Sequence, residues 1–270
     1  MRRSIVILFS LILLSSCSDY SKLLKSEDYE KKWETAQQFF KEGKYMRCIE
    51  LLEQTIPRYR FTDEAEEMSW MYANCHYLIE DYYSAIETFN SFYNTFQYGK
   101  YAEEAYYKMS VCSFLISPRA ELDQKYTNAA LSNFTYFVSK YPNSQYRDEC
   151  NNYIKELQEK LAEKSYLSAK LYYDMGQYKA AITALTNSIS SYPDSKHREH
   201  LRYMKLDALY KYAQNSVYEK QKERYQDALD EYFTYIEEYP DGSYTKDVQR
   251  IYKNSSQFLG ITSKTSSEQE

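Results

Sequence analysis

The chain has 270 residues, of which 43% are hydrophobic, and its formal net charge is −5 at pH 7. This length and apolar content suffice for one extended domain or for an array of small repeats. No basic cluster is present, which argues against a nucleic-acid-binding protein. Tyrosine is abundant at 33 residues, whereas glycine and proline are scarce at 5 each, and this balance predicts long helices with short connections.

Residues 1–16 are predicted to be a lipoprotein signal peptide. Arg2 and Arg3 form a charged start, and an apolar run follows that is shorter than the about 20 residues of a membrane-spanning helix. The run ends in Leu-Ser-Ser-Cys, which resembles a bacterial lipobox, so Cys17 is the predicted lipid attachment site. An ordinary signal peptide that contains a cysteine is the alternative. Cleavage would remove two basic and no acidic residues, giving a formal charge of −7.

A short pattern recurs five times in the rest of the chain. Each copy has an aromatic residue, two variable residues, a small residue and then Ile or Leu, with one extra residue in the third copy. The small residues are Cys48, Ala85, Ala130, Ala181 and Ala228. Repeats of about 40 residues are typical of stacked helical hairpins, in which small residues let two helices approach closely. The predicted fold is therefore an all-α solenoid of about five helical hairpins with a C-terminal capping helix.

The predicted division of the chain follows these hairpins. Three hairpins form the N-terminal repeats, and two hairpins with extra helices form the C-terminal repeats, which include a charged helix near 145–163 and a capping helix near 244–258. Tyr-Pro-(Asn/Asp) steps separate several hairpins, because proline cannot continue a helix and the residues after it can cap the next one. The ranges are a lipidated tether at 17–27, N-terminal repeats at 28–142, C-terminal repeats at 143–258 and a disordered tail at 259–270.

The fourth hairpin carries a family resemblance. The tetratricopeptide (TPR) pattern of small, aromatic, small and terminal proline positions is matched at Ala169, Tyr172, Gly176, Tyr178, Ala181, Leu185 and Pro193. With the lipobox, the five hairpins and an insertion at Pro118-Arg119, the chain resembles the BamD family of outer-membrane lipoproteins over about residues 17–258. The chain departs from this family in its high tyrosine content and in its longer fifth repeat.

The resemblance implies a non-enzymatic adaptor of the outer-membrane β-barrel assembly machinery, held by its lipid at the periplasmic face of the outer membrane. It also implies three kinds of partner: the POTRA domains of a BamA-like barrel protein, other lipoproteins of the assembly complex, and unfolded outer-membrane precursors. A TPR lipoprotein that acts as a scaffold in cell-envelope or peptidoglycan coordination is the alternative, with the same fold and address. An envelope enzyme or glycan-binding lipoprotein would need a pocket of convergent polar groups, and the sequence shows none.

Three aromatic residues are candidates for a peptide-binding groove. Trp33 and Trp70 lie fifteen residues before the small residues of the first two repeats, and Tyr77 follows on the same predicted helix as Trp70. First helices line the concave face of TPR arrays, so these rings are expected to receive the aromatic end of an extended precursor peptide. Core packing is the alternative, because large aromatics at helical spacing usually pack.

No catalytic constellation is found in the sequence. It contains no glycine-rich phosphate loop, nucleophile elbow or Cys-x-x-Cys pair, and His197 and His200 have no third ligand cluster beside them. We therefore expect no enzymatic activity, no cofactor and no bound metal. Among the cysteines other than Cys17, Cys48 occupies a small-residue position, which favours core packing over a disulfide with Cys75.

Overall fold

The computed structural model describes residues 19–261. These residues form helices in consecutive packed pairs and contain no strand in that range, which confirms the predicted all-α, TPR-like architecture. The signal peptide, Cys17 and the tail after Ile261 lie outside the described residues. The helices are α2 (Tyr29–Lys41), α3 (Tyr45–Thr55), the 3-10 turn η1 (Ile56–Arg58), α4 (Ala65–Leu78), α5 (Tyr82–Thr95), α6 (Ala102–Leu115), α7 (Lys125–Lys140), α8 (Arg147–Asp174), α9 (Tyr178–Ser191), α10 (Arg198–Gln214), α11 (Tyr218–Glu238) and α12 (Thr245–Leu259).

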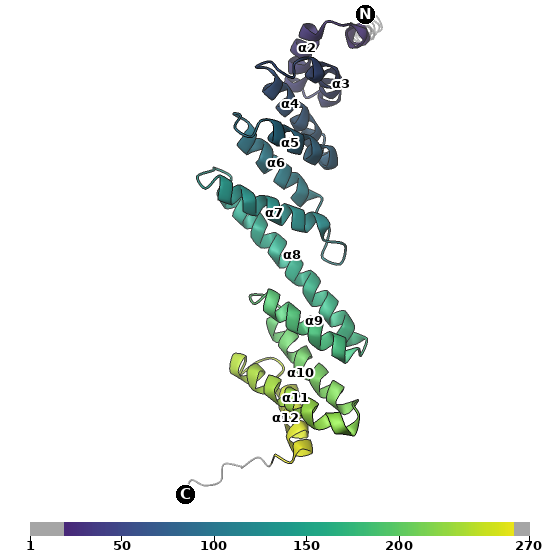
Figure 1. The fold of residues 1–270 in the computed structure, drawn as a ribbon, viewed down its shortest axis with the longest axis vertical. Coiled ribbons are helices and arrows are strands. Elements are labelled where there is room, and N and C mark those ends of the chain that lie inside the picture. Colours follow the sequence, from purple (N-terminus) through teal and green to yellow (C-terminus); the bar gives the residue numbers. More distant parts are fainter. Residues whose placement is uncertain (1–18, 262–270) are drawn as a thin grey trace, which may run out of the picture. The chain divides into compact units, whose positions relative to one another are not determined.

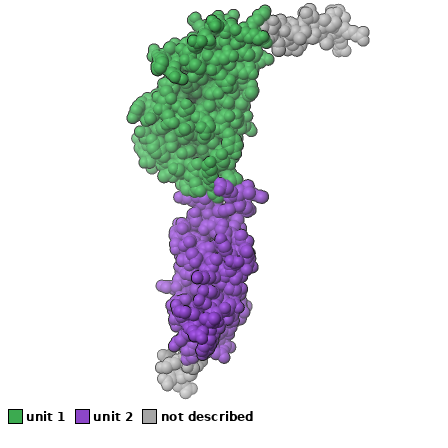
Figure 2. All heavy atoms as spheres, turned by 45° about the vertical axis from the view of Figure 1, so that its right-hand side comes forward, with its two compact units in different colours: residues 1–118, 124–157 green, residues 119–123, 158–270 purple. Residues whose placement is uncertain are grey.

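The chain divides into two compact units (Figure 2). Unit 1 comprises residues 1–118 and 124–157, and unit 2 comprises residues 119–123 and 158–270. The hairpins α2/α3, α4/α5 and α6/α7 belong to unit 1, whereas α9, the hairpin α10/α11 and the last helix α12 belong to unit 2 (Figure 1). The long helix α8 contributes its first part to unit 1 and the rest to unit 2.

The hairpin turns follow from local sequence. Asp28 and Asp81 cap α2 and α5, because each carboxylate accepts a hydrogen bond from the backbone N–H three residues later. Gly43 and Gly176 end the preceding helices with φ of +73° and +69°, a left-handed conformation that favours glycine. These turns are short, so the two helices of each hairpin pack against one another as antiparallel neighbours.

All five small residues of the repeat pattern are fully buried. In unit 2, Ala181 of α9 packs in one cluster with Ala169 of α8 and Leu201 of α10. In unit 1, Cys48 of α3 packs with Met71 of α4. The recurring pattern therefore marks the tight helix contacts of the fold, as predicted.

The helix α8 differs from the expected arrangement. The sequence suggests a charged helix near 145–163 and a separate first helix for the fourth hairpin, but the structure has one helix of 28 residues. No proline or glycine interrupts the sequence between Arg147 and Gly176, so nothing ends the helix earlier. Its buried residues Cys150 and Leu157 belong to a core cluster of unit 1, and Tyr166 and Ala169 to one of unit 2.

Stacked aromatic rings join one hairpin to the next, a feature that the sequence reasoning missed. In each pair, one ring lies on the first helix of a hairpin (α4, α6, α8 or α10). It stacks on a ring just before the helix that begins the next step of the array (α6, α8, α10 or α12). Centroid distances are 3.8 to 4.4 Å and interplanar angles 7 to 18°. The pairs are Trp70–Tyr101, Tyr107–Tyr146, Tyr166–His197 and Tyr203–Tyr244. Such pairs add about 0.5–1.5 kcal/mol beyond simple burial.

Candidate functional site

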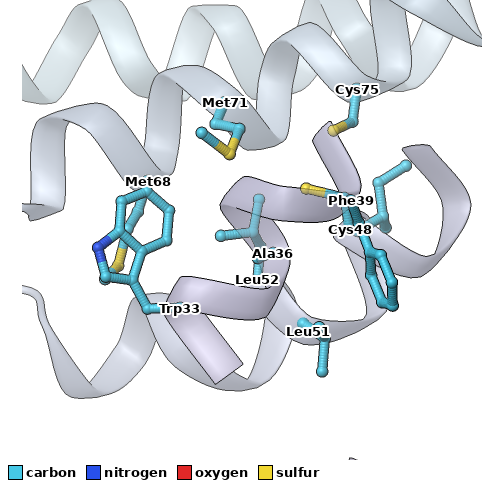
Figure 3. Close-up of a cluster of buried hydrophobic side chains, with 10 residues drawn as sticks. Trp33, Ala36, Phe39, Cys48, Leu51, Leu52, Met68, Met71 and Cys75 are labelled. Carbon is cyan, nitrogen blue, oxygen red and sulfur yellow. The ribbon is translucent and has the colours of Figure 1, made fainter. Parts of the chain in front are cut away.

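Trp33, the first of the predicted groove residues, lies in the hydrophobic core of unit 1. Only 9% of its surface is exposed, and it belongs to a cluster with Ala36 of its own helix and Met68 of α4 (Figure 3). Its indole therefore helps to hold the first two hairpins together.

Trp70 and Tyr77 are half-buried and lie two turns apart on α4. The ring of Trp70 stacks on Tyr101, and its buried Nε1–H has no hydrogen-bond acceptor among the described residues. Tyr77 meets Tyr82 edge to face, with a centroid distance of 6.2 Å. Because this Nε1–H is itself buried, the missing acceptor is a cost to the fold and does not make the atom accessible to a partner.

Lys108 of α6 links the two rings. Its Nζ atom lies 5.5 Å from the centroid of Trp70 and 5.4 Å from that of Tyr77, which are cation–π distances. The same ammonium is held by Glu104 at 2.7 Å and donates to the Asn74 amide oxygen at 2.5 Å. We call these three residues, Trp70, Tyr77 and Lys108, the aromatic–lysine face.

The sequence reasoning missed Lys108 and Asn74. Asn74 gives a weak signal, because it is a polar residue on the same helix face as Trp70 and Tyr77, and the structure shows it almost fully buried. Lys108 gives none, since nothing in its own helix indicates which rings of α4 it meets. Burial is the main cause that raises the pKa of Tyr77 above its usual value, so its hydroxyl stays protonated and can donate.

The two histidines considered as metal ligands have other partners. The Nε2 atom of His197 lies 2.8 Å from the Glu163 carboxylate, and its ring stacks on Tyr166. The Nδ1 atom of His200 lies 3.0 Å from the Tyr166 hydroxyl. Among residues 19–261 no group of three or more His, Cys, Asp or Glu side chains is placed to hold a metal ion.

The four cysteines within the described residues are buried thiols. Burial raises the pKa of Cys112 and of Cys150 to about 12, so neither thiol ionises readily. The neighbouring Cys48 thiol, together with burial, raises the pKa of Cys75. Their positions agree with a packing role.

None of the helices within residues 19–261 is long and apolar enough to span a membrane.

Sequence comparison places the chain in a known family. A family model described as YfiO, outer membrane lipoprotein, matches residues 25–186 and 167–257. The chain belongs to this family. Two similar proteins are the outer membrane protein assembly factors BamD of Caulobacter vibrioides and Vibrio cholerae, each 22% identical.

The two relatives differ in how much of them is matched. The Vibrio alignment covers 80% of this chain and 94% of the relative, whereas the Caulobacter alignment covers 62% and 54%. The chain thus spans about half the length of the Caulobacter relative.

Solved structures similar to the chain are TPR proteins. The TPR domain of P58(IPK) is 14% identical, with a TM-score of 0.41, 91% of this chain covered and 69% of that one. The TPR2AB domain of yeast Sti1 is 15% identical, with a TM-score of 0.38 and coverage of 85% and 98%.

Proposed function

We propose that the chain is a lipid-anchored, non-enzymatic adaptor that assembles outer-membrane β-barrel proteins at the periplasmic face of the outer membrane. The observation that carries the proposal is the match to an outer membrane lipoprotein family over residues 25–257. The naming of two relatives as outer membrane protein assembly factors supports it. The hairpin architecture agrees, because stacked hairpins offer long surfaces for other proteins.

Unit 2 is the proposed docking region for the POTRA domains of a BamA-like barrel protein and for other lipoproteins of the complex. Support comes from exposed apolar side chains beside the turns that precede α9 and α11. Between 58 and 79% of each side chain is exposed at Leu171, Met175, Val217 and Tyr218. Large apolar groups in such numbers are a feature of protein-binding surfaces.

Unit 1 is proposed to receive unfolded precursors through the aromatic–lysine face. An aromatic side chain at the end of an extended peptide can pack beside the exposed parts of Trp70 and Tyr77. Lys108 lies beside both rings with its charge paired to Glu104, so it orders this face and does not act as a free charge. Because Trp33 is packed in the core, we assign it only a supporting role for this face.

Replacing Trp70 tests the precursor site. We expect Trp70→Ala to weaken binding of a synthetic peptide with a C-terminal aromatic residue about tenfold, as for a buried aromatic anchor. Isothermal titration would measure the affinity, with circular dichroism to confirm the fold. The matched control is Tyr98→Ala, which removes a ring that is 92% exposed in the same unit. Unchanged affinity of a folded Trp70→Ala protein would refute the site.

Depletion of the protein from its host tests the adaptor role itself. We expect β-barrel proteins to be lost from the outer membrane and a BamA-like protein to co-purify with the chain. Normal barrel levels after depletion would contradict the proposal and would favour the scaffold in envelope or peptidoglycan coordination.

A further inference from the structure

The residues that follow Cys17 are docked on the first hairpin. Residues 19–25 are helical, and Leu23 and Leu24 pack against the core cluster of unit 1. The ring of Tyr20 meets Phe39 of α2 edge to face at 5.6 Å, and its hydroxyl donates to Glu50 of α3. This segment, predicted as a tether, is thus fixed to α2 and α3.

A buried lysine holds the other end of this segment. The Lys32 ammonium donates to the Leu24 and Ser26 carbonyls at 3.3 and 2.6 Å, and to the Gln54 side chain at 2.6 Å. Because Lys32 is 2% exposed, these bonds are shielded from water and hold the segment firmly.

The lipid attachment site therefore lies close to a defined part of unit 1. Only Ser18 separates Cys17 from Asp19, the first described residue. A chain spans at most about 3.6 Å per residue, so the Cys17 Cα lies within about 7 Å of the Asp19 Cα. Tyr20 next to it contacts Phe39 near the end of α2 and Arg47 near the start of α3. The end of α2 and the start of α3 therefore lie beside the first described residues, which follow Cys17 directly.

The side chains around this turn suit a membrane surface. We call the group Lys22, Lys41, Lys44, Met46 and Arg47 the N-terminal corner. Lys22, Lys41 and Lys44 are exposed, and 60% of Met46 is exposed although it is apolar. Asp19 and Glu42 pair with Lys22 and Lys44, and Glu50 accepts from Tyr20 beside Arg47, so the four cations exceed the three acids by one in a chain that is acidic overall. The Arg47 guanidinium lies 5.1 Å from the Tyr20 ring centroid, so it holds the docked segment as well.

We propose that the N-terminal corner lies against the anionic headgroups of the bilayer that holds Cys17, with Met46 at the interface. The inference rests on lipid attachment at Cys17, which is part of the proposed function. Lysine and arginine side chains close to an anionic leaflet are attracted to it, and an apolar group at the surface adds to the attraction. An anchor and a cationic surface together would fix the face that unit 1 turns to the membrane.

Fluorescence quenching by brominated lipids tests the contact. The probe is the full-length acylated protein carrying M46W, reconstituted into vesicles of equimolar phosphatidylcholine and phosphatidylglycerol with brominated acyl chains. We expect its emission to be quenched strongly, after subtraction of the parent protein with its two native tryptophans. The matched control is Y98W, at a residue that is 92% exposed between α5 and α6 of the same unit and that we expect to be quenched little.

Charge reversal separates contact from accidental proximity. We expect K41E/K44E in the M46W background to lose most of the quenching in anionic vesicles, whereas K140E/K155E, at two exposed lysines elsewhere in unit 1, keeps it. Quenching of M46W no stronger than that of Y98W would overturn the proposal, as would quenching insensitive to K41E/K44E. Mass spectrometry of Cys17 separates failure of this inference from failure of the proposed function. An unacylated Cys17 would overturn the lipid anchor itself.

Discussion

Between hairpins, the backbone N–H groups just before the next helix receive a hydrogen-bond acceptor in one of two ways. At two of the steps, Ser144 and Ser195 accept a hydrogen bond from the backbone N–H two residues later. At two others, glycine stands in the serine position, and a glutamate from the preceding first helix accepts instead. Glu66 accepts from the Tyr101 N–H at 3.1 Å beside Gly99, and Glu199 accepts from the Ser243 N–H beside Gly242. Glycine is required at residues 99 and 242 because the glutamate carboxylate occupies the space that a Cβ atom would fill.

Substitution of Gly99 tests this close approach. A Cβ atom at residue 99 would lie 2.2 Å from the Glu66 Oε1 atom, so the carboxylate must leave the Tyr101 N–H. We expect Gly99→Ala to lower the free energy of unfolding by about 1–3 kcal/mol, the cost of losing a hydrogen bond to a charged acceptor. Urea denaturation would measure it. In a Glu66→Ala background the same substitution should cost little, and an equal cost in both backgrounds would contradict the explanation.

His200 makes the stability of unit 2 depend on pH. Burial, followed by the nearby charges of Lys170 and His197, holds the pKa of His200 below its ordinary value near 6.5. The unfolded state therefore binds the proton more readily, and the free energy of unfolding falls as pH decreases from about 7 to 5. The ring also meets Tyr166, Tyr203 and Tyr244.

We expect His200→Gln to reduce this pH dependence, because glutamine can still hydrogen-bond the Tyr166 hydroxyl but does not titrate. Denaturation midpoints of the two proteins at pH 7.5 and 5.5 would show it. Carboxylates contribute equally to both proteins, so their difference isolates His200. A variant as sensitive to pH as the parent would show that another group is responsible.

The candidate site could be predicted in part at this scale. Trp70 and Tyr77 follow from their positions in a repeated pattern on one helix, because periodicity reports which residues share a face. Lys108 could not be predicted, since its contact with Trp70 depends on how α4 and α6 pack. Trp33 occupies the same repeat position as Trp70, yet it packs in the core against Met68, whereas Trp70 stacks on Tyr101.

At the scale of elements, a buried ion network joins α10 to α11. Glu231 of α11 is only 6% exposed and contacts the Arg202 guanidinium at 3.0 Å and the Lys205 ammonium at 2.6 Å. Arg202 also pairs with Glu238 at 2.7 Å, which lies two turns further along α11. Charges in such a position are retained only when each has partners, so the network specifies how the two helices align.

Truncation of Glu231 should destabilise this pair of helices. We expect Glu231→Ala to lower the free energy of unfolding by on the order of 3 kcal/mol, because Lys205 is left partly buried without its carboxylate. The matched control is Glu223→Ala on the same helix, whose pairing with Lys220 is exposed and is worth less than about 1 kcal/mol. Equal losses in the two variants, measured by thermal unfolding, would argue against a structural role for the network.

The helices themselves were largely predictable. The terminal signals of Asp28, Gly43 and Gly176 act within one or two turns, so the sequence locates the ends of these elements. The length of α8 was not expected, because the repeat pattern suggests a hairpin boundary where the chain has no residue that stops a helix. Helix propagation continues until a breaker intervenes, and Gly176 is the first one after Arg147.

At the scale of the whole molecule, we propose that attachment to the outer membrane depends on the N-terminus. In the proposed function, the lipid on Cys17 supplies the stable attachment to the bilayer. We expect Cys17→Ala to move the protein from the membrane to the soluble fraction after a high-salt wash, since salt also weakens the attraction of the N-terminal corner. Fractionation and immunoblotting would measure this. Retention of the washed variant on membranes would contradict lipid anchoring.

The sequence by itself determined the all-α class, the repeated hairpins and the family resemblance, because these depend on short-range periodicity, capping and motif order. Only the tertiary structure decided which rings and charges meet. The stacked pairs join residues 31 to 41 positions apart, and Lys108 lies 31 and 38 residues from the rings it covers. Such contacts depend on the spacing between packed helices, which no local pattern encodes. The same holds for the docking of residues 19–25, whose place is set by Phe39, Arg47 and Lys32 on the first hairpin.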